Sequence, residues 1–306
     1  MIRYPSVDLH THTTYSDGAD TPSQLVAKAA GIGVWHLAVT DHDTVEALPE
    51  ARQAGLAYGV EIVSGVELTV QYEDYQDIHL LAYGFDADHP ALVQRLHEIQ
   101  AHRVERGLEI LRRINERLSA AGRTLLDRDR VLARADGALA RPHLAEELLE
   151  QGHVQTFQDA FRDFLIPCNV PKANLGLDEA VALIAQAGGI CSLAHPGTLG
   201  SDTEEIERLL TAFTAMGMVG VEAYHHCHDT AFIEFLCTCA RRLGLAETGG
   251  SDYHGRAQGA TLGFIAPNTP VPDTVLNAIT DLTHARARNA MHHPAARDGV
   301  SREREL

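Results

Sequence analysis

Short apolar segments of strand type alternate with helical segments along most of this chain of 306 residues. Strands are expected at 7–9, 36–40, 61–70, 77–85, 190–194, 219–224 and 245–248. Helices are expected between them at 22–31, 45–55, 177–187, 202–215 and 229–243. Such alternation is typical of an α/β fold with a mostly parallel sheet or barrel.

One long stretch breaks this alternation. Helical spacing alone is found at 90–118, 141–151 and 155–165. We therefore expect a barrel built from residues 1–87 and 171–290, a helical insertion or cap at 88–170, and a C-terminal tail at 291–306. Residues 95–134 hold ten arginines and six acids. Either these charges pair between neighbouring helical turns, or the cap brings positive charge towards an anionic ligand.

Composition limits the possible partners. The net charge of −17 disfavours binding to long nucleic acid or to an anionic membrane. No apolar run is long enough for a membrane span, and no signal peptide is visible, so a cytoplasmic protein is expected. No obligate protein partner is evident. Five cysteines without a CxxC pair indicate neither a disulfide framework nor a zinc knuckle. Cys237 and Cys239 are expected to be reduced and structural, and Trp35 is expected in the core.

Polar side chains gather where the expected strands end, the place at which parallel β/α folds form their sites. Two imidazoles in a His-x-His segment point to the same side of an extended chain. The six imidazoles and three carboxylates at these positions are too many for one four-coordinate ion. Two or three divalent ions are therefore predicted, with Glu67 as a bridging carboxylate. The predicted ligands are His10, His12, Asp17, His42, Glu67, His79, His195, Asp252 and His254.

Six motifs carry a resemblance to a known family. They are Asp8-Leu9-His10-Thr11-His12, Ser16-Asp17-Gly18, Thr40-Asp41-His42-Asp43, Gly65-Val66-Glu67, Ala194-His195-Pro196-Gly197 and Gly250-Ser251-Asp252-Tyr253-His254. In this order they resemble the motifs of the PHP (polymerase and histidinol phosphatase) family. The resemblance implies a distorted seven-stranded β/α barrel, (β/α)7, with a trinuclear metal site.

The resemblance also implies how the ligands are divided. The first metal would take His10, His12, Glu67 and Asp252. The second would take Glu67, His79 and His195, and the third Asp17, His42 and His254. Manganese is the frequent occupant in the family, and iron, zinc and magnesium are also used. Mixed nitrogen and oxygen ligands disfavour a site filled only by magnesium.

The insertion narrows the resemblance within the family. The stretches 141–152 and 161–165 resemble the cap of bacterial nucleoside 3′,5′-bisphosphate phosphatases, a subgroup that includes the 5′→3′ exoribonuclease of short RNA. The C-terminal residues 303–306 resemble the end of that exoribonuclease. Residues 166–169 are shorter than in these relatives and lack a glycine and a basic side chain, a charge for which Lys172 could substitute.

These features predict a metal-dependent phosphoesterase. A hydroxide shared between two metals would attack the phosphorus of a small nucleotide or a short 5′-phosphorylated oligoribonucleotide. Arg141 offers a planar fork for a second phosphate, and His143 could assist it. His228 could touch phosphate or protonate the leaving oxygen. The competing interpretations are a helix cap or surface ion pair for Arg141, and a surface loop for His228 with its neighbours His225 and His226.

Other classes of protein remain as alternatives. A metal-dependent amidohydrolase often bridges two metals with a carboxylated lysine, but neither Lys28 nor Lys172 ends an expected strand. A metal-binding module without catalysis would show gaps in the ligand set, and none of the nine positions is missing. Histidinol-phosphate phosphatase is the close alternative among phosphoesterases, and the cap region favours nucleotides over it.

Overall fold

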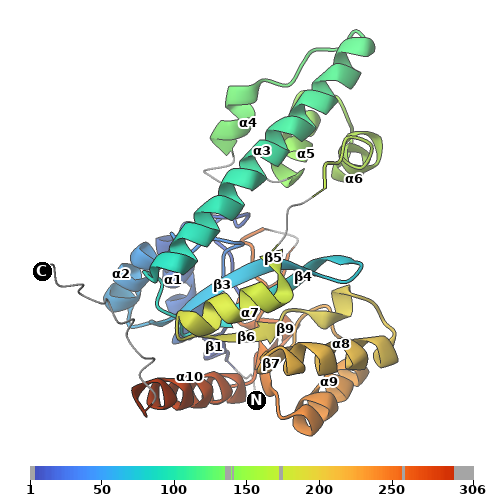
Figure 1. The fold of residues 1–306 in the computed structure, drawn as a ribbon. Helices are drawn as coiled ribbons and strands as arrows, with labels where there is room; N and C mark the ends of the chain where they lie inside the picture. Colours follow the sequence, from blue (N-terminus) through green and yellow to red (C-terminus); the bar gives the residue numbers. More distant parts are fainter. Residues whose placement is uncertain (1–3, 135–138, 140, 172–174, 257–258, 293–306) are drawn as a thin grey trace, which may run out of the picture.

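A computed structural model describes residues 4–134, 139, 141–171, 175–256 and 259–292 of the chain. Its centre is one strongly curved sheet (Figure 1). The strands follow one another in the sheet as β1 (Val7–Asp8), β2 (His36–Val39), β3 (Glu61–Tyr72), β4 (Tyr75–Tyr83), β6 (Ile190–Leu193), β7 (Gly220–Tyr224) and β8 (Ala246–Gly249).

Strand β4 is the irregular member of this sheet. It runs antiparallel to both β3 and β6, whereas the other neighbours in the strand order are parallel. The reason is a tight hairpin between β3 and β4, in which Glu73 takes a positive φ of 50°. The short strand β5 (Leu175–Gly176), which the sequence did not predict, pairs with β3. The sheet is thus mixed but mainly parallel.

The two ends of the sheet meet just beyond β1 and β8. The Asp252 N–H donates to the His10 carbonyl at 2.9 Å, and the His12 N–H donates to the Tyr253 carbonyl at 2.9 Å. A parallel bridge pairs Thr11 with Tyr253 between these bonds. The seven strands therefore form a nearly closed barrel, which confirms the predicted fold class.

Helices α1 (Pro22–Ile32), α2 (Leu48–Tyr58), α7 (Leu177–Gln186), α8 (Thr203–Ala215) and α9 (Thr230–Leu243) follow the strands as predicted. Helix α1 begins as its sequence indicates. The side chain of Thr21 accepts from the N–H of Gln24, whose side chain accepts from the N–H of Thr21. Cys237 and Cys239 of α9 are buried and free, as predicted.

The insertion has its own apolar core. Helix α3 (Pro90–Ala120) leaves the barrel, and α4 (Arg128–Arg134), α5 (Arg141–Glu150) and α6 (Phe157–Ala160) lie along its outer part (Figure 1). The helix predicted over 155–165 is wrong as one α-helix, because α6 passes into a π-helical turn at Phe161–Leu165. Helix α4 was not predicted. The domain boundaries drawn from the sequence stay a prediction.

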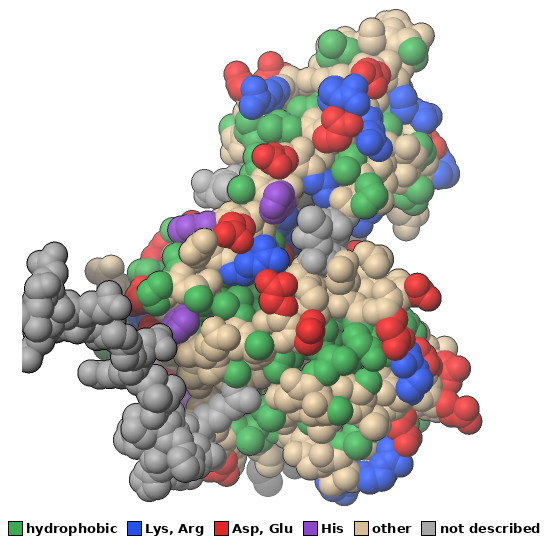
Figure 2. Space-filling view, in the orientation of Figure 1, with side chains coloured by type: hydrophobic (Ala, Val, Ile, Leu, Met, Phe, Trp, Pro, Cys, Tyr) green, Lys and Arg blue, Asp and Glu red, His purple; other side chains and the backbone are tan. Residues whose placement is uncertain are grey.

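Much of the charge on the insertion pairs locally. Arg113 lies 2.9 Å from Glu109, one helical turn earlier, and Arg162 lies 2.7 Å from Asp159. Figure 2 shows basic side chains interspersed with acidic ones over these helices. Although α3 has 31 residues, neither it nor another helix in the described part of the chain could cross a membrane.

A C-terminal element closes the barrel at one end. Helix α10 (Thr274–His292) and the small hairpin of β9 (Phe264–Ala266) and β10 (Thr269–Pro270) were not predicted. Val275 and Ile279 of α10 pack against residues of the barrel interior, among them Val7, Leu81 and Ile190. The prediction for Trp35 is wrong: its side chain is 48% exposed, because it lies just before β2, outside the sheet.

Candidate metal centre

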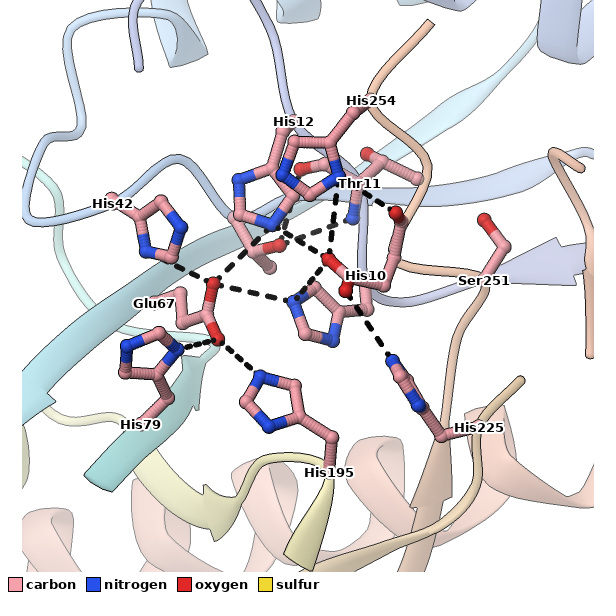
Figure 3. A network of polar contacts seen from close by, with 12 residues as sticks. His10, Thr11, His12, His42, Glu67, His79, His195, His225, Ser251 and His254 are labelled. Atoms are coloured by element: carbon pink, nitrogen blue, oxygen red, sulfur yellow. Dashed lines mark hydrogen bonds and ion pairs between the residues drawn. The ribbon is translucent and has the colours of Figure 1, made fainter. Parts of the chain in front are cut away.

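The nine predicted ligands come together at one end of the barrel, and Glu67 of β3 lies among five imidazoles (Figure 3). Glu67 Oε1 lies 2.9 Å from His79 Nδ1 and 3.0 Å from His195 Nε2. The other oxygen, Oε2, faces three more rings. It lies 3.3 Å from His10 Nε2, 3.3 Å from His12 Nε2 and 3.1 Å from His42 Nδ1. One carboxylate thus touches residues from several separate strand ends.

Two further carboxylates lie on the same side of the cluster. Asp252 Oδ1 lies 3.1 Å from His12 Nε2 and 3.4 Å from His10 Nε2. Asp17 Oδ1 lies 3.1 Å from His254 Nε2 and is within 4 Å of a nitrogen of His12. The His-x-His segment therefore faces all three acids, as its alternation predicted.

Three sets of these side chains offer ligand atoms that all lie within 4.8 Å of one another. Glu67 belongs to two of the sets, which is the position that a bridging carboxylate would occupy. The sets are His10, His12 and Glu67; His42, Glu67 and His79; and His12, Asp17, His42 and His254.

The donor atoms of the cluster fit divalent cations. His10 Nε2, His12 Nε2, His42 Nδ1 and Asp17 Oδ1 are buried and have no hydrogen-bond partner among the described residues. Buried polar atoms without partners are costly, so a group that satisfies several at once is implied. Imidazole nitrogens with carboxylate oxygens suit manganese, iron or zinc.

The charges in the cluster favour ionised acids. Burial raises the pKa of Glu67, but the imidazoles of His42, His79 and His10 hold that pKa well below its usual value. Burial lowers the pKa of His12, yet Asp252 and Glu67 raise it to about 10. Burial lowers the pKa of His42 to about 3. The acids are thus ready to ligate a cation, whereas His12 must first lose a proton.

Glu222 of β7 lies outside the predicted ligand set and contacts two of its members, His10 and His195. Its Oε1 lies 2.9 Å from His10 Nδ1, and its Oε2 accepts from the His195 N–H at 2.7 Å. Because Glu222 engages Nδ1 of His10, Nε2 is left facing the acids. Sequence reasoning missed this residue. Its only signal was a glutamate within an otherwise apolar buried strand.

Asp8 and Asp41, which belong to the predicted motifs, fix the loops that carry predicted ligands. Asp8 accepts at 2.9 Å from the N–H of Ser251, the residue before Asp252, and at 2.7 Å from the N–H of Gly263. Asp41 accepts from the Thr13 N–H at 2.7 Å and from Ser16 Oγ at 2.5 Å, next to Asp17. Both acids are buried. They hold the loops around the cluster and are not members of it.

Three non-glycine residues of the site adopt positive φ angles. They are Asp43 at 53°, His195 at 24° and Asp252 at 57°. Such angles are uncommon for residues with a side chain and often occur at functional sites. Each of these residues lies in the turn after a strand. The turn directs the side chain of that residue, or of its neighbour in the sequence, towards the cluster.

The surface-loop interpretation is wrong for His225. This residue is 2% exposed, and its Nε2 lies 3.5 Å from Asp252 Oδ2. The reason is that the loop after β7 folds inward towards Asp252 instead of outward. His226, the next residue, is exposed as expected.

The predicted substrate contacts lie at different places. Arg141 begins α5 and lines a cavity of about 480 Å³ together with Asp17, His42 and His79 of the cluster. His143 is buried within α5. His228 Nδ1 lies 3.0 Å from the Ala223 carbonyl, and its Nε2 accepts from the Gly197 N–H at 3.1 Å. Both nitrogens of His228 therefore already engage backbone.

Comparisons with known proteins point to one family. The family model described as PHP domain matches residues 8–160. The chain is 33% identical over 266 residues to a 3′,5′-nucleoside bisphosphate phosphatase of Chromobacterium violaceum, covering 83% of this chain and 89% of that protein. It is 34% identical over 254 residues to a 5′-3′ exoribonuclease of Salmonella typhimurium, covering 81% and 84%.

Two further similar proteins carry names of other phosphoesterases. A phosphoribosyl 1,2-cyclic phosphate 1,2-diphosphodiesterase of Eggerthella lenta is 33% identical over 256 residues, covering 81% of this chain and 94% of that protein. A solved structure from Bifidobacterium adolescentis, named as a candidate metal-dependent phosphoesterase, aligns with a TM-score of 0.76 and 31% identity over 91% of this chain and 97% of that one. The chain therefore belongs to the PHP family and is a metal-dependent phosphoesterase.

Proposed function

We propose that the protein hydrolyses phosphate esters of small nucleotides, removing the 3′-phosphate of nucleoside 3′,5′-bisphosphates or cleaving short 5′-phosphorylated RNA from its 5′ end. One observation carries the proposal. The cavity next to the cluster is lined on the insertion side by three arginines, Arg103 and Arg106 of α3 and Arg141 of α5.

The three arginines differ in how much of their charge is available. Arg103 lies 2.9 Å from the Asp43 carboxylate, which neutralises it. Arg106 donates to the Val170 carbonyl at 2.7 Å and to Asn169 Oδ1 at 2.8 Å, both uncharged. Burial and the nearby guanidinium of Arg141 lower the pKa of Arg106. Arg106 and Arg141 therefore bring positive charge to a cavity whose lining also includes the acids Asp17, Asp43 and Asp77.

This charge distribution favours a substrate with two phosphates. One phosphate would lie at the metal cluster, and a second would lie against Arg106 and Arg141, where a guanidinium can bind two phosphate oxygens. Histidinol phosphate has one phosphate and a positive amine, which the two arginines would repel. It remains the alternative substrate of the same centre.

We assign the metals by the ligand sets that the family resemblance implies, with manganese as the expected ion and two to three ions per chain. When bound, such ions neutralise phosphate oxygens and ionise water near neutral pH. Glu67 would hold two of the ions at a fixed distance. Glu222 would keep His10 and the turn at His195 in place. His228 would hold the Gly197 turn beside the cavity, and His143 would support the start of α5.

The names of the relatives support this choice without deciding it. A bisphosphate phosphatase and an exoribonuclease both act on phosphates of nucleotides, as their names state. The name of the Eggerthella lenta protein states a cyclic phosphate. Lys28, which the amidohydrolase alternative would need as a bridge, lies instead 2.7 Å from Asp20. A cytoplasmic location and the lack of an obligate protein partner stay predictions.

The test is phosphate release by the manganese-loaded protein from adenosine 3′,5′-bisphosphate, AMP, histidinol phosphate, a ribose cyclic phosphate and a 5′-phosphorylated oligoribonucleotide. We expect the bisphosphate or the oligonucleotide to give the highest kcat/KM. Turnover of histidinol phosphate alone would show that the nucleotide assignment is wrong.

The role of the arginines is tested on the same panel with an aryl phosphate as a substrate that has one phosphate. Arg106→Ala and Arg141→Ala should each lower kcat/KM for the bisphosphate about 10- to 100-fold, the cost of one charged hydrogen bond or two. The aryl phosphate should change much less. Arg112→Ala, which removes an exposed arginine of α3 paired with Glu109, is the matched control. Equal losses of kcat/KM on both substrates would indicate that Arg141 has a structural role instead.

A further inference from the structure

We propose that His225 is an additional metal ligand, binding through Nε2 the ion assigned above to His10, His12, Glu67 and Asp252. This inference rests on the proposed metal centre and adds a residue that neither the motifs nor the resemblance includes. It would give the first ion a third imidazole ligand.

The position of the His225 ring carries the inference. The residue is 2% exposed, and its Nε2 has no hydrogen-bond partner among the described residues. Ligand atoms of His10, His225 and Asp252 all lie within 4.8 Å of one another. A buried nitrogen that faces a carboxylate and another imidazole in this way is satisfied by a cation that all three share.

Asp252 faces the cluster with both oxygens. Its Oδ1 lies 3.1 Å from His12 Nε2, and its Oδ2 lies 3.5 Å from His225 Nε2. At 3.5 Å the second contact is too long for a strong hydrogen bond. The separation instead leaves room for an ion beside Asp252 to contact both its carboxylate and the His225 ring.

The other nitrogen of His225 has a possible sulfur acceptor beside it. Nδ1 lies 2.9 Å from Cys227 Sγ and 3.2 Å from the Cys227 backbone nitrogen. If Nε2 gives its lone pair to a cation, the ring proton belongs on Nδ1, where the Cys227 sulfur can accept it. Ligating histidines commonly donate their second N–H to such an outer partner.

The loop that carries His225 is held firmly. His228 N–H donates to the His225 carbonyl at 3.1 Å, and His226 Nδ1 lies 3.1 Å from the Ser251 carbonyl, beside Asp252. These contacts connect the loop after β7 to the loop after β8. His225 and Asp252 are therefore kept in register, as two ligands of one ion must be.

A third imidazole would change the metal preference. Nitrogen ligands favour iron, cobalt, nickel and zinc over magnesium and calcium. With His10, His12 and His225 on one ion, we infer that the first position selects a transition metal more strongly than the other two.

The experiment uses the full chain, stripped of metal by a chelator and titrated with Co²⁺. Binding is followed by equilibrium dialysis and by NMR of exchangeable protons that the paramagnetic ion shifts, because a ligating imidazole keeps one N–H near the ion. His225→Asn should weaken one Co²⁺ site by at least about tenfold and remove one shifted N–H signal. His97→Asn, which removes an exposed imidazole of α3 paired with Glu46 away from the cluster, should keep that signal and the affinity.

A second variant leaves the His225 side chain in place. Cys227→Ser changes only the acceptor beside Nδ1 and should move that same N–H signal while the others stay. If His225→Asn keeps every shifted signal, or if Cys227→Ser moves none, His225 is not a ligand. Equal losses in His225→Asn and His97→Asn would also overturn the inference. Failure of the unaltered protein to bind Co²⁺ would instead reject the metal centre itself.

Discussion

The guanidinium of Arg103 in helix α3 lies 2.9 Å from Oδ2 of Asp43, in the loop that follows strand β2. The same guanidinium donates at 3.3 Å to the carbonyl of His42, the neighbouring predicted ligand. Asp43 is 1% exposed, and its other oxygen accepts from the Thr69 N–H. A residue of the insertion thus fixes a loop of the metal centre.

Removing this arginine should destabilise the protein. Arg103→Met leaves the Asp43 carboxylate buried without its charged partner, and breaking a buried pair in this way costs about 3–5 kcal/mol. Because the Arg103 side chain is 27% exposed, we expect a smaller loss, about 2 kcal/mol in the free energy of unfolding by urea.

The double variant separates the pair from other effects. Asp43→Asn removes the charge while asparagine tolerates the positive φ of this position. Adding it to Arg103→Met should recover part of the lost stability. A cost for Arg103→Met below about 0.5 kcal/mol would mean that the pair behaves like an exposed surface ion pair.

Glu222 should matter for metal affinity rather than for metal number. Glu222→Gln keeps the size of the side chain but removes the charge beside His10 Nδ1, so His10 becomes a weaker ligand. We expect the affinity of the first ion to fall about 10- to 100-fold in a chelator competition. Glu247→Gln in β8, where the carboxylate accepts from the Tyr224 hydroxyl, is the control and should leave affinity unchanged. Equal changes in the two variants would contradict the role of Glu222.

Much of the fold and of the ligand cluster could be predicted because their signals are local. The capping box of α1 and the His-x-His segment each depend on residues a few positions apart. The antiparallel direction of β4 is a property of the hairpin, which apolar alternation does not encode. Helix α10 follows a stretch with little periodic pattern. Its apolar face becomes evident only from its packing against the barrel interior.

The residues that were missed act over long separations in the sequence. Glu222 meets His10 across 212 positions, and Arg103 meets Asp43 across sixty. His225 stands beside His226 with the same side-chain chemistry, yet one is buried and the other exposed. Only the path of the loop distinguishes them, and that path depends on its contact with Ser251.

Gly250 should not tolerate a side chain. A Cβ at this position would lie 2.3 Å from His10 Cβ and 2.4 Å from the His10 backbone nitrogen. Gly250→Ala must therefore push the His10 strand away from the segment that closes the barrel. We expect a loss of several kcal/mol in unfolding free energy, about the cost of overpacking a core or more, and loss of the first metal.

Gly31→Ala is the matched control for this substitution. Gly31 lies in α1 with nothing within 4 Å of an added Cβ. Alanine there should stabilise the protein by about 0.5–1 kcal/mol, because glycine loses more freedom in a helix. If Gly250→Ala is as well tolerated as Gly31→Ala in thermal unfolding, the close approach of residue 250 to His10 is wrong.

Metal binding should release protons at neutral pH. In the metal-free protein the neighbouring acids raise the pKa of His12 from 6.5 to about 10, so the ring is protonated at pH 7. That ion pairing stabilises the metal-free fold fully below pH 6.5 and is lost as the pH rises through about 10. A cation requires the neutral ring, so its affinity changes in the opposite direction and rises with pH over this window. Calorimetric titrations with Mn²⁺ at pH 7, in buffers of different ionisation enthalpy, should show release of about one proton or more. Heats that do not depend on the buffer would mean that His12 is already neutral before the metal binds.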